Sequence, residues 1–490
     1  MLFNSYVFVG FFLPLTLAGF AAVSRLGSRA AMGWLTGASL LFYTWWTPAG
    51  LPLLLCSVLG NYVLSVLILR AGGRLRTAIA VFGVTANLAA LAWCKYLAAV
   101  LGFLGLSVGA ATAVLPLGIS FFTFTQIGYL LDCRAGVTAG SSLLDYMLFV
   151  TFFPSIAAGP ILSGNAVLPQ FADRAGFRLS AMNLCVGSGF FLIGLLKKTL
   201  LADPLSAIVA PGFAHPGTLP MAGAWQAALG YSLQLYFDFS GYSDMAIGLG
   251  RMFGVRLPVN FASPYKAESV IDYWQRWHMT LTRFLMATVY TPVALTVMRW
   301  RRAHRRPVDR AAQRTPAGFG AMLAMPILVT MALVGIWHGA NMTFLVFGLL
   351  HAVFLLINHG WRLFRGTIRA KGVSAVIGRV AVTYLSVVIG AAVFRADSVT
   401  GAWTMLLSMA GAAGAPLLSP DPKWGVHAAW LASLYAIVWI APNTQQIMGQ
   451  AESVRLRWRP TLPWAVAFGC AAAVGVLSIG GTGEFLYFQF

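Results

Sequence analysis

Charged side chains are scarce in this sequence of 490 residues. Asp, Glu, Lys and Arg make up 9% of it and hydrophobic residues 59%, whereas soluble domains carry about 25% charged residues. A water-soluble fold could not cover so much apolar surface, and no polar block is long enough for an additional soluble domain. Apolar runs close to the roughly 20 residues that cross a bilayer therefore predict an all-α polytopic membrane protein. We expect one integral membrane domain over residues 1–490.

Acidic residues are the rarer of the two charged kinds: 13 Asp and Glu stand against 33 Lys and Arg, a net charge of +20. This excess does not indicate nucleic-acid binding, because Lys and Arg lie in short clusters between apolar runs, as in cytoplasmic loops of membrane proteins. Arg25 and Arg29 follow the first run, and Arg70, Arg74 and Arg76 follow the third. This pattern predicts an extracytoplasmic N-terminus.

Several motifs with a known chemistry are missing. The five Cys lack the spacing of a disulfide framework or a zinc site. No two His stand four residues apart on a predicted helix, and no phosphate-binding or dinucleotide-binding loop is present. We therefore expect no metal and no permanently bound cofactor. A Ser-His-Asp triad remains an alternative, although no nucleophile-elbow motif marks its Ser.

The apolar runs predict about 11–12 transmembrane helices. Two further segments are less regular. Residues 146–162 contain Pro154, Gly159 and Pro160, and the two prolines break helical hydrogen bonding because they lack an N–H. Broken backbone at membrane depth survives only inside protein or beside a water-filled cavity. We therefore expect a re-entrant hairpin. Residues 270–298 lie in the interface or dip into the membrane. The predicted spans are 3–23, 31–47, 51–69, 78–102, 113–131, 183–202, 224–248, 320–337, 340–358, 380–394, 428–441 and 462–480.

His338 stands in the segment GIWHGANMTF, within a stretch from Thr315 to Trp361 that has no Asp, Glu, Lys or Arg. An ionisable group inside a membrane is costly and indicates function. A neutral imidazole can take the proton of a hydroxyl or thiol, a step worth about 10²–10⁴ in rate. The alternative is a packed histidine bonded to a backbone carbonyl, which is the expected state of His351 and His359.

Two other segments hold polar residues among apolar ones. In DYWQRWHMTLTRF, an interfacial belt accounts for Trp277 and Arg276, but less well for Asp272 and His278. In YFDFSGYSDMAIGLGRMFG, two acids need partners, for which Arg251 and Arg256 are candidates. The alternative is a buried polar network that fixes helix packing. The candidate residues of this segment are Asp238, Ser240, Tyr242 and Asp244.

These segments together resemble the membrane-bound O-acyltransferase family, and within it the bacterial branch that acetylates alginate. The resemblance rests on residues 236–284 followed by GIWHGANMTFLVFGLLHA at 335–352. Further matching segments lie at 2–15, 115–132, 145–161, 194–205 and 484–490, and the motif core covers about 115–360.

The resemblance implies a bundle of helices with a funnel on each face, in a bacterial inner membrane. An acyl group would pass from a cytoplasmic thioester, acetyl-CoA or a carrier-protein thioester, toward a hydroxyl of an exported polysaccharide such as alginate. An extracytoplasmic acetyltransferase-like protein would be the partner, besides membrane lipids. His338 would be the catalytic base and His278 the second family histidine, with Trp337, Arg276 and Trp277 in the same motifs. We add Asn341 as a candidate for stabilising the oxyanion.

One segment departs from the family pattern. Residues 286–306, MATVYTPVALTVMRWRRAHRR, keep Tyr290 and Pro292 but lack the acidic residue and the Gly pair of the branch. The Arg cluster from Arg299 to Arg314 could meet CoA phosphates or anionic lipid, or reflect only positive-inside charge. The alternatives are transfer of D-alanine from a carrier protein to wall polymers, acetylation of peptidoglycan, a glycan transporter, and a scaffold without chemistry.

Overall fold

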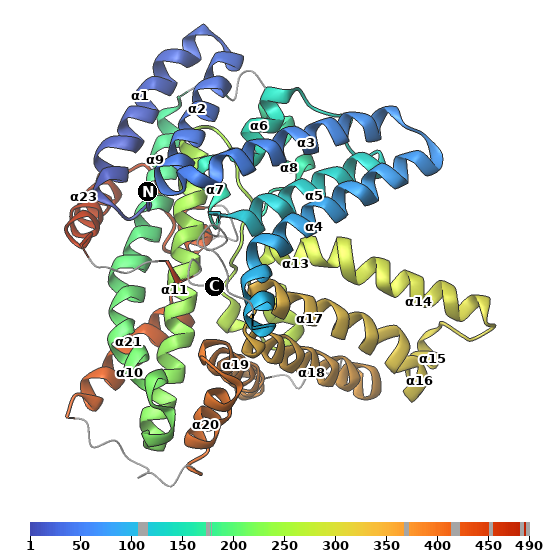
Figure 1. Ribbon diagram of the computed structural model, residues 1–490. Helices are drawn as coiled ribbons and strands as arrows, with labels where there is room; N and C mark the ends of the chain where they lie inside the picture. Colours follow the sequence, from blue (N-terminus) through green and yellow to red (C-terminus); the bar gives the residue numbers. More distant parts are fainter. Residues whose placement is uncertain are drawn as a thin grey trace. The chain divides into compact units, whose positions relative to one another are not determined.

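The computed structural model describes residues 1–105, 116–172, 177, 179–366, 372–412, 422–449, 454–480, 485 and 486. Within these ranges every regular element is a helix (Figure 1). The first residues of the predicted span 113–131 and most of the tail motif 484–490 lie outside the described residues. The prediction of an all-α fold is confirmed.

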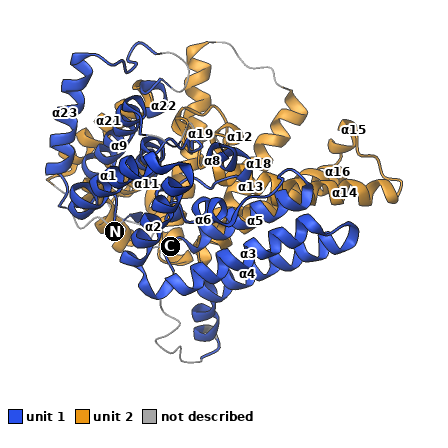
Figure 2. Ribbon diagram, turned by 90° about the horizontal axis from the view of Figure 1, so that it is seen from above, with its two compact units in different colours: residues 1–200, 239–259, 444–487 blue, residues 201–238, 260–443, 488–490 orange. Residues whose placement is uncertain are grey.

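The chain divides into two compact units that are interleaved in sequence (Figure 2). Unit 1 comprises Met1–Leu200, Phe239–Val259 and Thr444–Tyr487, and unit 2 comprises Leu201–Asp238, Asn260–Asn443 and Phe488–Phe490. Helix α11 (Met221–Met252) contributes its first part to unit 2 and its last part to unit 1. The expectation of a single domain stays a prediction.

Unit 1 contains the N-terminal helices and a short C-terminal group. Helices α3, α4 and α5 pack side by side, and α2 packs on α6. Its helices are η1 (Phe8–Phe12), α1 (Leu13–Val23), η2 (Ser24–Leu26), α2 (Ser28–Trp46), η3 (Pro48–Gly50), α3 (Leu51–Arg70), α4 (Gly73–Phe103), α5 (Ile119–Ala135), α6 (Leu143–Thr151), α7 (Phe153–Ile156), α8 (Gly164–Ala172), α9 (Ala181–Leu196), η5 (Lys197–Ala202, which runs into unit 2), α22 (Thr444–Ile447) and α23 (Leu462–Leu477).

Unit 2 is built around the antiparallel pair α17 and α18, on which α19 packs. Its helices are η6 (Asp203–Leu205), α10 (Ser206–Ala214), η7 (Pro216–Thr218), η8 (Pro264–Lys266), α12 (Val270–Trp274), α13 (Met279–Leu285), η9 (Met286–Tyr290), α14 (Thr291–Ala303), α15 (Arg310–Gln313), α16 (Pro316–Phe319), η10 (Gly320–Ala324), α17 (Met325–His338), α18 (Met342–Arg365), α19 (Val373–Arg395), α20 (Val399–Met409) and α21 (Trp424–Ile440).

Eight helical stretches of the described residues are long and apolar enough to cross a membrane, which confirms a polytopic membrane protein. They are Phe8–Leu26, Pro48–Arg70, Gly73–Gly102, Ala181–Ala214, Met279–Ala303, Pro316–His338, Met342–Arg365 and Val373–Arg395, with shorter apolar helices at Val399–Met409, Trp424–Ile440 and Leu462–Leu477. The predicted spans at 31–47, 113–131 and 224–248 form α2, α5 and α11 but are not among the eight. In α11 the charges of Asp238, Asp244 and Arg251 lower the hydropathy.

One of the eight stretches was not expected as a regular span. Residues Met279–Ala303 form continuous helix where the sequence suggested an interfacial or dipping segment. Pro292 lacks an amide hydrogen, and it is the second residue of α14, which follows the π-helical turn η9 directly; a proline is tolerated in such a first turn.

The broken segment at 146–162 lies inside unit 1. Helix α6 ends at Thr151, Phe152 leaves the helical region with φ −47° and ψ 110°, and Pro154 stands in the first turn of α7. Nearly every residue from Tyr146 to Leu162 is buried. Protein atoms rather than lipid therefore surround the backbone groups that the break releases, as such backbone requires.

Four glycines bring α9 and the last part of α11 into backbone contact. A Cβ atom on Gly248 would lie 2.5 Å from the carbonyl oxygen of Gly187, and one on Gly187 would lie 2.6 Å from that of Gly248. Gly194 and Gly241 repeat this arrangement at 2.5 and 2.8 Å. Small residues at such crossings let membrane helices approach closely. The same crossing fixes the position of Asp244, which lies between the two contacts.

Candidate active site

A second glycine crossing positions His338. Gly335 on α17 faces the carbonyl oxygen of Phe344, and Gly348 on α18 faces that of Met331; an added Cβ would lie 2.3 and 2.2 Å from those oxygens. Gly339, with φ 164° and ψ −178°, ends α17 directly after His338. The imidazole therefore stands at the last residue of one membrane helix, where a tightly packed pair of helices holds its backbone.

The His338 ring is half-buried and has aromatic neighbours. Its centroid lies 4.7 Å from that of Trp337 and 4.8 Å from that of Phe394, which meets it edge to face at 89°. Phe344 and Phe347 follow at 6.0 and 6.1 Å. Four aromatic rings therefore pack around the imidazole that the sequence predicts to be the base.

His278 is held in a different way. It is buried, and its backbone adopts the left-handed conformation with φ 43° at the start of α13. A non-glycine residue there carries strain that the surroundings must sustain. Asn260 supplies the support, because its carbonyl oxygen accepts the amide hydrogen of Met279 at 2.9 Å and its side chain contacts His278 Nδ1 at 3.0 Å.

The same contacts fix the tautomer of His278. The backbone N–H of Thr280 donates to Oδ1 of Asn260 at 3.2 Å, and the Thr280 hydroxyl donates to it at 3.0 Å. A backbone N–H can face only an acceptor, so this atom is the amide oxygen. Nδ1 of His278 must then carry its hydrogen, and Nε2 carries the lone pair. Burial lowers the pKa of His278 to about 3, so the ring is neutral at pH 7.

The two histidines share a neighbour. The Trp337 ring lies 6.1 Å from the His278 ring and 4.7 Å from the His338 ring. Unit 2 therefore brings together two predicted site residues that are far apart in the sequence, around an indole that was also predicted. The unusual polarity of each segment was the signal in the sequence. The contact of Trp337 with both histidines could not be predicted from it.

Asn341 has a structural part in this region. Its Oδ1 accepts the backbone N–H of Thr343 at 3.0 Å, which caps α18, and its Nδ2 donates to the carbonyl oxygen of Asp397 at 2.9 Å. Both ends of the amide are thus engaged, which is typical of a residue at a helix start. The role of Asn341 in stabilising the oxyanion stays a prediction.

The belt residues around His278 form an ordered group. Nε of Arg276 donates to the Asp272 carboxylate at 2.8 Å. The same carboxylate accepts the backbone N–H of Glu268 at 3.1 Å. Trp277 stacks on Tyr273, with ring centroids 5.7 Å apart at 17°. Asp272, which a membrane belt explained poorly, therefore orders the segment that leads to His278.

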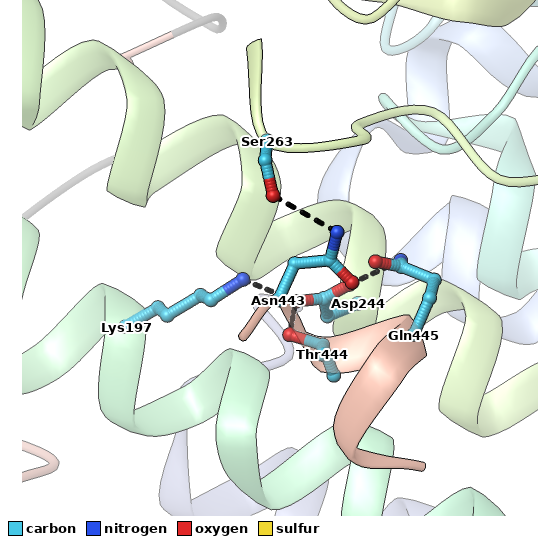
Figure 3. A network of polar contacts seen from close by, with 6 residues as sticks. All are labelled: Lys197, Asp244, Ser263, Asn443, Thr444 and Gln445. Atoms are coloured by element: carbon cyan, nitrogen blue, oxygen red, sulfur yellow. Dashed lines mark hydrogen bonds and ion pairs between the residues drawn. The ribbon is translucent and has the colours of Figure 1, made fainter. Parts of the chain in front are cut away.

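The acidic residues of α11 differ from the expectation. Asp244 is buried and pairs with Lys197 at 2.6 Å, not with Arg251 or Arg256 (Figure 3). Thr444 and Gln445 donate to the same carboxylate at 2.6 and 3.2 Å. These contacts match the alternative of a buried network, since they join η5, α11 and α22. Lys197 stands too far away in the sequence for a local pattern to identify it.

The remaining candidates of α11 are also buried. Tyr242 stacks between Phe3 and Phe485, at centroid distances of 4.8 and 4.6 Å. Asp238 and Ser240 are each 1% exposed. Asp238 belongs to unit 2, whereas Ser240, Tyr242 and Asp244 belong to unit 1.

Part of the Arg cluster at 299–314 supports its own helix end. Arg301 is buried, and its Nε and a terminal nitrogen donate to the carbonyl oxygen of Pro307 at 3.1 and 2.9 Å. The Arg306 guanidinium lies 5.2 Å above the Trp300 ring. Arg301 and Arg306 therefore close the turn after α14. The remaining arginines of the cluster are the ones that could face a ligand or lipid.

Comparison with known proteins identifies the family. A model of the membrane-bound O-acyltransferase family matches residues 134–303. The peptidoglycan O-acetyltransferase of Helicobacter pylori is 34% identical over 74% of this chain and 71% of its own. The probable alginate O-acetylase AlgI of Pseudomonas aeruginosa is 35% identical over 84% and 75%, and that of Pseudomonas putida is 32% identical over the full length of both chains.

This chain belongs to the membrane-bound O-acyltransferase family. It is a multi-pass membrane enzyme, an O-acyltransferase, and the enzymes of this family use acyl-thioester donors. The family predicted from its sequence segments is thereby confirmed. The extracytoplasmic position of the N-terminus, the roles of the site residues and the partner protein stay predictions.

Proposed function

We propose that this enzyme transfers an acetyl group from a cytoplasmic thioester, acetyl-CoA, toward hydroxyls of an exported polysaccharide, with His338 as the base. The names of two relatives carry the proposal: the peptidoglycan enzyme, 34% identical, and the alginate enzyme of Pseudomonas aeruginosa, 35% identical, are both named for O-acetylation of a glycan. An extracytoplasmic acetyltransferase-like partner would pass the group to its final acceptor.

The proposed step needs one proton acceptor at membrane depth. The acceptor hydroxyl attacks the thioester carbonyl while its proton moves to the imidazole of His338. A C–O bond forms, the C–S bond breaks, and the leaving thiolate takes the proton from the imidazolium, so that a thiol and an ester result and the imidazole is neutral again. A base fixed at the end of α17 can meet a donor from one face and an acceptor from the other, which removes much of the entropic cost of bringing them together.

His278 is proposed to act on the donor side of the same reaction. Its Nδ1–H tautomer, set by Asn260, leaves a lone pair on Nε2 that can accept a hydrogen bond. The Trp337 indole adjoins both imidazoles and supplies an apolar wall. Such a wall limits hydrolysis of the thioester by water.

Inside-out membrane vesicles test the donor and the base together. Vesicles that contain the protein receive radiolabelled acetyl-CoA, and label released from polysaccharide by mild base is counted. We expect His338→Gln to lower the rate by about 10² or more, since a general base contributes about 10²–10⁴. The exposed His215 gives a matched control, His215→Gln, which keeps the wild-type rate. Labelling from D-alanine on a carrier protein, and not from acetyl-CoA, would refute the acetyl proposal.

A further inference from the structure

The end of α11 carries two arginines that face one cavity. Arg251, Arg256, Ile247 and Leu257 line a space of about 410 Å³, and all four belong to unit 1. Asp244, one of the two acids for which these arginines were the predicted partners, pairs with Lys197 instead. The structure thus leaves two cations beside a cavity without the role that the sequence suggested.

The local sequence GRMFGV determines where the backbones of Arg251 and Arg256 lie. The N–H of Val255 donates to the carbonyl oxygen of Gly250 at 2.8 Å, and that of Gly254 donates to the carbonyl oxygen of Arg251 at 3.0 Å. Gly254 has φ 81°, so the helix ends in a Schellman motif. The reversal brings Arg256 back beside the last helical turn, where Arg251 stands.

Arg256 is anchored by its backbone rather than by its side chain. Gln170 on α8 accepts the N–H of Arg256 at 2.8 Å and donates to its carbonyl oxygen at 3.1 Å. These two bonds hold the main chain of the turn and leave the guanidinium to face the cavity. The main chain of the turn is therefore fixed, and the exposed side chain of Arg256 extends from it beside the cavity.

The charges of the pair are not balanced within the part of the chain that the structure describes. There, no carboxylate lies within ion-pair distance of either guanidinium, and the buried Nε of Arg251 has no hydrogen-bond partner. Burial and the like charge of Arg256 lower the pKa of Arg251, although a guanidinium stays protonated. The helix C-terminus contributes only about half a negative charge, so the site keeps a net positive charge.

We propose that this cavity binds a phosphate group between Arg251 and Arg256. Guanidinium groups match phosphate oxygens in pairs of parallel hydrogen bonds, and a bound phosphate would give the buried Nε its acceptor. Two sources present this chemistry: the phosphates of a nucleotide such as the CoA donor, or the headgroup of an anionic phospholipid. The nucleotide source rests on the proposed function, whereas the lipid source does not.

Binding measurements on the full-length protein separate the two sources. In nanodiscs of phosphatidylcholine alone, adenosine 3′,5′-bisphosphate is titrated as the nucleotide probe. In mixed phosphatidylcholine and phosphatidylglycerol, lipid retained on the protein is counted by native mass spectrometry. We expect Arg251→Gln and Arg256→Gln each to weaken one of these interactions about tenfold. The exposed pair Arg455→Gln and Arg459→Gln controls for charge and keeps wild-type binding.

A double lysine variant controls for loss of folding. Arg251→Lys with Arg256→Lys keeps both charges but not the paired geometry, so an intermediate loss of binding is expected. The proposal is overturned if the wild type binds neither probe, or if the folded double Gln variant binds both within about twofold of the wild type. No acyl transfer is measured, so failure here leaves the proposed acetyl transfer untouched.

Discussion

The glycine crossing between α9 and α11 gives the sharpest prediction for stability. Gly248→Ala places a Cβ atom 2.5 Å from the carbonyl oxygen of Gly187, so the two helices must move apart by about 1 Å to restore ordinary contact. Overpacking of this kind costs about 1–3 kcal/mol. The gain in helix propensity from Gly to Ala offsets at most about 1 kcal/mol of that. We expect a net loss of about 1–2 kcal/mol.

The matched control, Gly60→Ala, is expected to change stability in the opposite direction. A Cβ atom on Gly60, in the middle of α3, meets nothing within 4 Å. Gly60→Ala should therefore stabilise the protein by up to about 1 kcal/mol through helix propensity alone. Thermal unfolding midpoints of the two variants in the same detergent, at one scan rate, decide the matter. Equal midpoints for Gly248→Ala and wild type would show that the helices do not meet at these glycines.

Three further predictions concern polar contacts. Asp244→Asn should destabilise the protein by about 3–5 kcal/mol, because Lys197 loses a buried counter-charge; an unchanged unfolding midpoint would contradict this. Asn260→Ala should lower the transfer rate, because His278 Nδ1 and Thr280 lose their acceptor, and Asn260→Asp should restore part of it. Burial holds the folded pKa of His278 near 3 against about 6.5 unfolded, so only the unfolded chain binds its proton between these values. The stability advantage of wild type over His278→Gln should therefore shrink as pH falls from 6.5, as midpoints across pH 7.5 to 4.5 would show.

The parts of this molecule that could be predicted were those encoded locally. Apolar runs and their polar interruptions located the helices and singled out His278 and His338. The break at Pro154 was likewise visible, because proline removes a helical hydrogen bond. Residues Met279–Ala303 were misjudged because Trp and Arg at its ends resemble an interface, although the residues between them are apolar enough to span.

Partners that lie far apart in the sequence could not be predicted. Lys197 pairs with Asp244 although Arg251 stands nearer along the chain, because the glycines of α9 and α11 bring these helices together. Asn260 sets the tautomer of His278 through a loop whose polar residues carry no pattern of their own. Periodicity shows which face of a helix is apolar, but not which helix will cover it.

The central claim is that His338 is the base for acetylation of an exported glycan. The most direct measurement is the ester content of the cell's exopolysaccharide, by mild-base release and mass spectrometry, in a deletion strain that carries the wild type, His338→Gln or His278→Gln at matched membrane levels. We predict that acetate disappears in the deletion strain and with His338→Gln, and returns with the wild type. Unchanged acetate in the deletion strain, or full acetate with His338→Gln, would contradict the claim.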